Sequence, residues 1–241
     1  MERHLPTFEK LTTPWRWIVV EGAAMNVKCT TWCKPQQPRL SRDGTAEYLT
    51  KISRHPNVTV IRKQSWAGKV DMCNACVVKI TEPCTLIQVD VDEFWSAEQI
   101  EMIHTCFKMG QQYNRAHFCC DYFVGPNIVT VGENCYGNNP GEWLRAWRFT
   151  PGDAWVSHEP PYLKQQCPGQ TLDREATRRH GLVFRHEAYT LESQVAFKER
   201  FYGYRDAVKH WKRLQDNTDW PVKRLKNFLP WVDDRVGANR I

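Results

Sequence analysis

The sequence predicts an α/β protein in which helices flank a mostly parallel sheet and a helical extension follows at the C-terminal end. Three observations support this class. Apolar runs that suit buried strands alternate with amphipathic stretches over residues 15–90. The 241 residues, 41% of them hydrophobic and 25% charged, suffice for one sizeable core. The spacing of the segments favours right-handed crossovers, which make neighbouring strands parallel.

Five segments in the first half of the chain carry this alternation. Two β-branched runs, residues 15–23 (WRWIVVEGA) and 57–62 (NVTVIR), are expected to form strands. The stretch between them, 43–55, has apolar residues at helical spacing behind a capping-type aspartate. A second helix is predicted over residues 69–80 and a third strand over 85–90. Ligands of such sheets bind beyond the carboxyl ends of the strands, so a site is expected there.

In the middle of the chain, apolar residues recur at every second position instead of at helical spacing. Ser96 and Gln99 form a capping-box signature for a helix that Gly110 ends. Three later runs alternate between apolar and polar residues and are expected to form extended, partly antiparallel strands: residues 116–124, 127–132 and 142–149.

The last part of the chain has a helical pattern. From Thr190 onward we expect one long amphipathic helix, with Phe201 and Trp211 on its apolar face. Residues 1–189 are therefore predicted to form the main domain, and residues 190–241 a helical extension packed on it.

Positive charge is concentrated in the last third of the chain. From Gln170 onward, 15 Lys and Arg against 10 Asp and Glu leave +5 of the net +6. This bias suits an anionic partner such as a nucleotide diphosphate, an acidic glycan, a lipid headgroup or nucleic acid, and a solvated basic helix is the plain alternative. No apolar run approaches the ~20 residues of a membrane span, and residues 1–10 lack the apolar core of a secretory signal. We expect a cytoplasmic protein, compatible with peripheral membrane contact.

Two aspartates end the third predicted strand, in the stretch TLIQVDVDEFW (residues 85–95). Because residues two apart in a strand point to the same face, Asp90 and Asp92 face one side. Carboxylates at the end of an apolar strand are costly unless a cation or hydrogen-bond donors meet them. Mg²⁺ or Mn²⁺, with oxygen ligands shared by a bound diphosphate, meets this need. Glu93 is expected to form a salt bridge or to support the loop.

Four of the ten cysteines have spacings that a zinc site could use. These are Cys29, Cys33, Cys73 and Cys76. Cys73, however, falls on the apolar stripe of a predicted helix, where free cysteines commonly pack. We therefore favour reduced core thiols over structural zinc.

Four motifs follow one another in a recognisable order: WIVVEGA (17–23), NVTVIR (57–62), WAGKVDMCNACV (66–77) and EPCTLIQVDVDEFW (82–95). This order resembles a GT-A glycosyltransferase, close to the large family-2-like group. The resemblance implies a GT-A-like, Rossmann-like fold over most of the chain and a nucleotide-sugar donor.

The resemblance also implies roles for single residues near the donor. Glu21 and Gly22 would meet the nucleotide base or ribose. Lys69 would line the donor side, together with Gly68 and Asn74. Asp90 would approach the ribose or the metal, and Asp92 would bind the metal.

The second half of the chain offers further single-residue matches. GNNPGEW (137–143) resembles the glycine-containing loop of these enzymes. Glu159 would be the catalytic base, with His158 as its competitor, and His186 a late metal ligand. Trp95 and Trp155 flank the two acidic motifs, where an indole could stack on a sugar ring or simply pack in the core.

Together these features predict a metal-dependent glycosyltransferase that uses Mn²⁺ or Mg²⁺. It would move a sugar from a nucleotide-sugar to a hydroxyl of a glycan or glycoconjugate, with inversion of the anomeric centre. One alternative is a Mg²⁺-dependent phosphohydrolase or nucleotidyltransferase that uses the same aspartates, although the motif continues Glu-Phe-Trp and departs from D-x-D-x-T. The other is a non-catalytic nucleic-acid-binding protein. That alternative leaves the strand-end carboxylates unexplained, so no nucleic-acid partner is expected.

Overall fold

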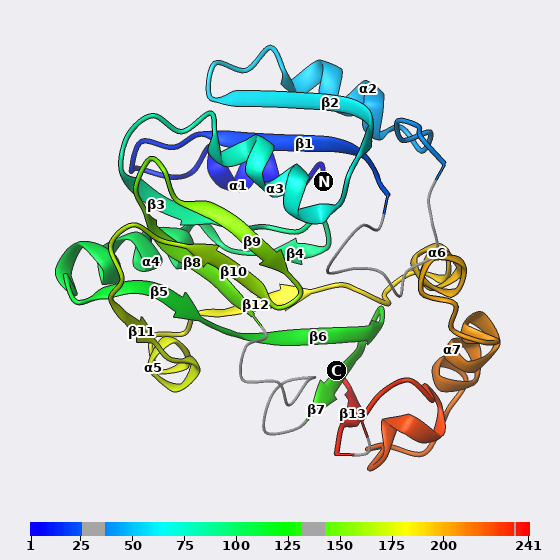
Figure 1. Ribbon diagram of the computed structural model, residues 1–241. Helices are drawn as coiled ribbons and strands as arrows, with labels where there is room; N and C mark the ends of the chain where they lie inside the picture. Colours follow the sequence, from blue (N-terminus) through cyan, green and yellow to red (C-terminus); the bar gives the residue numbers. More distant parts are fainter. Residues whose placement is uncertain (26–36, 132–142, 234) are drawn as a thin grey trace.

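The computed structural model describes residues 1–25, 37–131, 143–233 and 235–241 (Figure 1). Within these ranges the protein has a mixed α/β architecture. Its elements, in chain order, are α1 (His4–Phe8), β1 (Trp17–Ala24), α2 (Thr45–Ile52), β2 (Val58–Trp66), α3 (Lys69–Val77), β3 (Cys84–Ile87), β4 (Glu93–Phe94), α4 (Ala97–Met109), β5 (Tyr113–His117), β6 (Cys119–Gly125), β7 (Ile128–Val131), β8 (Leu144–Phe149), β9 (Ala154–His158), β10 (Pro161–Lys164), β11 (Gln170–Leu172), α5 (Arg174–Arg179), β12 (Val183–His186), α6 (Glu192–Tyr202), α7 (Ala207–Gln215), the 3₁₀ turn η1 (Leu225–Asn227) and β13 (Gly237–Arg240).

The strands form four hydrogen-bonded groups, ordered β1-β2, β10-β9, β11-β5-β8-β3 and β13-β7-β6-β12-β4. β1 and β2 are parallel, as the first half of the sequence predicts. Among the described strands two more pairs are parallel, β5 with β11 and β6 with β12, whereas the other pairs are antiparallel. The expectation of a mostly parallel sheet is therefore corrected to a set of mixed and antiparallel sheets. The reason is β8, which runs antiparallel to both of its neighbours, β3 and β5.

Local signals in the sequence correspond closely to the observed elements. α3 and β3 lie where a helix and a strand are predicted, each a few residues shorter. The Ser96 hydroxyl accepts a hydrogen bond from the backbone N–H of Gln99, and the Gln99 side chain accepts one from the backbone N–H of Ser96, which completes the predicted capping box of α4. Gly110 is the C-cap of the same helix. The alternating middle segments form β5, β6, β7 and β8.

The C-terminal part differs from the single long helix that was predicted. Gly203, in the left-handed conformation with φ of 77°, ends α6, and α7 begins four residues later at Ala207. The tail then returns to the sheet, where β13 pairs antiparallel with β7 (Figure 1). Residues 190–241 are thus only partly helical, and their last strand belongs to the same sheet as β6.

The core is built where these layers meet. The largest apolar cluster joins α4, β6 and β12 to the C-terminal segment, with Phe118, Phe184 and Leu214 each 0% exposed. A second cluster lies between α3, β8 and β9, centred on Trp147, and a third between β1 and α2, centred on Leu49. These packed regions hold the ends of β3, α3 and α6 around one cleft.

Candidate functional site

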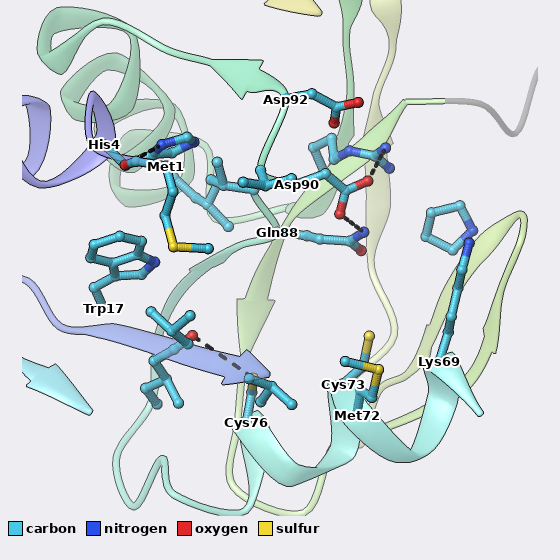
Figure 2. Close-up of a pocket in the computed structure, with 18 of the residues that line it drawn as sticks. Met1, His4, Trp17, Lys69, Met72, Cys73, Cys76, Gln88, Asp90 and Asp92 are labelled. Atoms are coloured by element: carbon cyan, nitrogen blue, oxygen red, sulfur yellow. Dashed lines mark hydrogen bonds and ion pairs between the residues drawn. The ribbon is translucent and has the colours of Figure 1, made fainter. Parts of the chain in front are cut away.

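A cleft of about 2380 Å³ lies beside the end of β3 (Figure 2). Five side chains singled out from the sequence line it: Lys69, Asp90, Asp92, Glu159 and His186. They come from the N-terminus of α3, the segment after β3, the segment after β9 and the end of β12. The fold therefore gathers residues that are far apart in the sequence into one cavity.

Asp90 lies at the floor of the cleft against a buried arginine. Nη2 of Arg145 is 3.5 Å from Oδ2 of Asp90, and the Gln88 amide donates to Oδ1 over 3.2 Å. Burial favours the protonated carboxyl, but the charges of Arg145 and His158 and the hydrogen bond from Gln88 together outweigh it and lower the pKa of Asp90 below its ordinary value. Figure 2 shows the Asp90 carboxylate directed toward Gln88. Asp90 is therefore an anionic group whose oxygens already have protein partners.

Glu93 forms the salt bridge that the sequence suggests, and its partner is the same arginine. Both carboxylate oxygens accept from Arg145, with Nη2 to Oε1 at 2.7 Å and Nε to Oε2 at 3.0 Å. Glu93 is 0% exposed and Arg145 is 5% exposed. This buried, bidentate pair fixes the turn that carries Asp90 and Asp92.

Asp92 faces a histidine and a lysine from later parts of the chain. Nε2 of His186 lies 3.5 Å from Oδ1 of Asp92. Burial works against ionisation of Asp92, but a hydrogen bond and positive charge from His186, with the charge of Lys198, lower its pKa well below the usual range. The two predicted metal ligands Asp92 and His186 are thus neighbours. Asp90 faces Arg145 instead.

Lys198, on α6, is a site residue that the sequence reasoning missed. It lines the cleft, and its ammonium interacts electrostatically with Asp92, Asp90 and Glu159. Its Nζ lies 4.8 Å from the centre of the Tyr189 ring. Burial, which disfavours the charged ammonium, lowers the pKa of Lys198. A lysine amid helical charges carries no signal in the sequence that separates it from its solvated neighbours.

Glu159 is held in an ion pair with Lys69. Its Oε1 accepts a hydrogen bond from the Lys69 ammonium and lies 3.5 Å from Nδ1 of His158. Burial raises the pKa of Glu159, but the contacts with His158 and Lys69 outweigh it and lower the pKa to about 2. Glu159 is accordingly ionised at neutral pH, and its proton affinity is low while Lys69 remains beside it.

Glu21 and Gly22 differ in their relation to the cleft. Glu21 is 5% exposed, and its carboxylate forms an ion pair with Nε of Arg62 at 3.1 Å and accepts a hydrogen bond from the backbone N–H of Ser41 at 3.1 Å. These partners occupy Glu21, which does not contribute to the described wall of the cleft. Gly22 does line it, at φ of 139°, and a Cβ there would overlap the carbonyl oxygen of Lys63. A glycine is therefore required at this position.

Asn74 and the two tryptophans have structural partners. The Asn74 amide exchanges two hydrogen bonds with the backbone of Trp155, at 3.0 and 2.8 Å, and so ties α3 to β9. Of the described residues Gly68, Lys69 and Asn74, only Lys69 lines the cleft. Trp95 stacks on Phe184, and Trp155 packs edge-on against Trp147, with both indoles almost fully buried. Of the two alternatives that the sequence leaves open, both indoles show core packing, and Trp155 also lines the cleft.

Two of the four cysteines considered for a zinc site lie among the described residues. Cys73 and Cys76 are half-buried on α3, and burial raises the pKa of the Cys76 thiol to about 12, which suits the predicted reduced thiol. Cys29 and Cys33 lie outside the described residues, as does most of the predicted loop, residues 137–142.

Within the described ranges, no group of three or more His, Cys, Asp or Glu side chains is arranged to hold a metal ion. Of the predicted metal ligands, Asp92 and His186 lie together and supply one carboxylate and one imidazole.

Comparison with known proteins adds no assignment, because the sequence matches no protein-family model and no curated protein. In the part of the chain that the structure describes, none of the helices has the length and apolar character needed to cross a membrane.

Proposed function

We propose that this protein is a metal-dependent glycosyltransferase of GT-A-like fold that transfers a sugar from a nucleotide-sugar to a hydroxyl acceptor. One observation carries the proposal: anionic Asp90 and Asp92, cationic Lys69 and Lys198, and His186 all line a single cleft. Acidic ligands for a divalent cation beside lysines for phosphate are the combination that a sugar diphosphate requires.

The donor diphosphate would lie between the two lysines. Lys69 at the N-terminus of α3 and Lys198 on α6 both interact with the carboxylates of the cleft, so a diphosphate would compete with these carboxylates for the two ammonium groups. Asp92 and His186 would hold Mn²⁺ or Mg²⁺, which when bound offsets negative charge on the leaving diphosphate. The protein itself positions the aspartates, because Arg145 pairs with both Asp90 and Glu93 and so holds the turn that carries Asp90 and Asp92.

Glu159 is the proposed base for the acceptor hydroxyl. Its carboxylate is ionised, and it lines the same cleft as the aspartates. When a phosphate group attracts the Lys69 ammonium, Glu159 loses one of the two neighbours, His158 and Lys69, that lower its pKa, and the pKa rises. Donor binding would thus increase the basicity of Glu159 at the step where a proton is removed. A single displacement then inverts the anomeric centre.

A thermal-shift panel tests the proposal directly. Nucleoside diphosphates and nucleotide-sugars are added with and without Mn²⁺, since a ligand that binds the native state raises the unfolding midpoint. We expect a shift that needs both nucleotide and Mn²⁺. The same protein with AMP and with inorganic diphosphate provides matched controls. A shift with inorganic diphosphate as large as that with every nucleotide, or none with any nucleotide, contradicts the proposal.

A phosphohydrolase would use the same aspartates, and its reaction products distinguish it from a glycosyltransferase. Incubation of the best-binding nucleotide-sugar with acceptor sugars should yield a new glycoside and a nucleoside diphosphate. Cleavage of the nucleotide-sugar by water to a nucleoside monophosphate and a sugar 1-phosphate, with no acceptor required, would instead assign the cleft to a phosphohydrolase.

A further inference from the structure

The strands β1 and β3 each have one edge without a partner strand among the described residues. β1 pairs with β2 alone, and β3 stands at the end of its sheet beside β8. β1 and β2 run parallel, and α3 carries the chain from the end of β2 back to the start of β3, so β3 has the direction of β1 (Figure 1). Both strands also line the large cleft. Two edges of the same direction therefore border one cavity.

The pairing register shows which backbone groups point into this cavity. The N–H of Trp17 donates to Asn57 on the β2 side, so the groups of the next residue, Ile18, point the other way. The Ile18 carbonyl is reached from the cleft side by Sγ of Cys76, at 3.9 Å. On β3 the N–H of Gln88 donates to Arg145 of β8, so the groups of Ile87 point away from β8. Each strand thus presents backbone donors and acceptors to the cavity.

The remaining walls of the cavity are helical and apolar. Met1 and Phe8 at one wall belong to the segment around α1, and Met72 and Cys76 at another wall belong to α3. Figure 2 shows Met1 and Trp17 on one side of the open space and the α3 residues on the other. An extended segment placed between the strands would have both of its faces covered by these side chains.

The burial of β1 and β3 is lower than their composition predicts. The apolar run TLIQV (residues 85–89) has the pattern of a fully buried strand, yet all five residues are only partly buried. Ile18 and Val20 of β1 are also only partly buried. Partly exposed apolar strands with unpaired edges are the features that strand addition removes.

We propose that the channel between β1 and β3 binds an apolar β-strand from another polypeptide, which pairs with both edges at once. A peptide backbone is the ligand that satisfies two facing rows of N–H and C=O groups, and apolar side chains suit both walls. This inference does not depend on the reaction of the Asp92 cleft.

The probe is a synthetic peptide of about eight apolar β-branched residues flanked by lysines for solubility, since β1 itself has 8 residues. A control peptide has the same sequence with an N-methyl group on each of the apolar residues, which removes the donors toward both edges. At a hundredfold excess over Kd the first peptide should raise the unfolding midpoint of the whole protein by roughly 5–10 °C. The N-methylated peptide should leave it unchanged.

Hydrogen exchange identifies the position of the bound peptide. Amides that face the channel, Ile18, Val20 and Ile87, should gain protection, whereas Gln88, already bonded to β8, should change little. Cys76→Phe, which fills the channel, should abolish both effects, and Val78→Phe, at a position 72% exposed on the same helix segment, should retain them. The proposal is overturned if the free peptide protects none of these amides, or if a nonionic detergent or the N-methylated peptide protects them equally.

Discussion

Nε2 of His186 lies 3.5 Å from Oδ1 of Asp92, and this contact joins the end of β12 to the segment that follows β3. The backbone holds it in place, because His186 is paired with Glu93 in the antiparallel β12–β4 ladder. The N–H of Glu187 also donates to the carbonyl oxygen of Asp92 over 2.7 Å. Asp92, in the turn before β4, and His186, at the end of β12, are consequently held together by backbone hydrogen bonds.

Asp92→Asn should abolish the Mn²⁺-dependent part of nucleotide binding. The substitution keeps the shape of the side chain but removes the anionic ligand. Thermal shifts with nucleoside diphosphate, with and without Mn²⁺, measure the effect, and circular dichroism checks the fold. Asp173→Asn, at the helix cap of α5 and away from the described wall of the cleft, is a matched control. Unchanged metal dependence in Asp92→Asn would remove Asp92 from the metal site.

Lys198→Met should weaken nucleoside diphosphate binding roughly 10- to 150-fold, since hydrogen bonds to charged groups contribute ~1.5–3 kcal/mol. Methionine keeps much of the apolar stem of the side chain. Isothermal titration calorimetry measures the affinity. Lys212→Met is the control, because Lys212 forms an exposed ion pair with Glu192 on the outside of α7. Equal affinities for the two variants would show that Lys198 does not contact the ligand.

Lys69→Met should raise the pKa of Glu159 from about 2 toward its ordinary value of 4.5. A carboxyl whose pKa is lower in the folded than in the unfolded state stabilises the fold at pH values above the unfolded-state pKa. This contribution is lost as the pH falls toward the folded-state pKa. In the wild type the loss therefore extends from about pH 4.5 down to about 2, and the variant should have less of this contribution to lose. Carbon-13 NMR titration of the glutamate carboxyls measures the pKa. Lys164→Met, an exposed lysine on β10, should leave it unchanged.

Glu159→Gln should reduce sugar transfer by ~10²–10⁴-fold, the usual cost of losing a general base. Donor affinity should change far less, because the base acts only in the transfer step. Single-turnover rates and donor titrations separate the two effects. A glutamine variant with nearly wild-type turnover, or a product with retained configuration, would reassign the base, with His158 as the next candidate.

Arg145→Met should destabilise the protein by ~3–5 kcal/mol, since it leaves the buried Glu93 carboxylate without its partner. Urea denaturation measures the free energy of unfolding. Arg235→Met removes an exposed pair with Asp233 and should cost only ~0–1 kcal/mol. Adding Glu93→Gln to Arg145→Met should recover part of the loss. A cost for Arg145→Met as small as that for Arg235→Met would contradict the structural role of the pair.

Local features of this protein could be predicted from its sequence. The capping box of Ser96 and Gln99, the parallel pair β1–β2, the helix α3 and the placement of Asp90 and Asp92 after β3 all follow from patterns within a few residues. Hydrogen bonds and side-chain periodicity act over that same range, so the sequence displays them directly.

Tertiary structure decided the features that depend on distant partners. The antiparallel insertion of β8 beside β3, the pairing of Glu21 with Arg62 and the arrival of Lys198 at Asp92 each join segments far apart in the chain. A glutamate at a strand end has the same local signal whether an arginine neutralises it or a ligand does. Only the packing of β2, β8 and α6 determines which charged side chains pair with one another. The reason is that Coulomb and hydrogen-bond energies depend on spatial distance and burial, and not on position in the sequence.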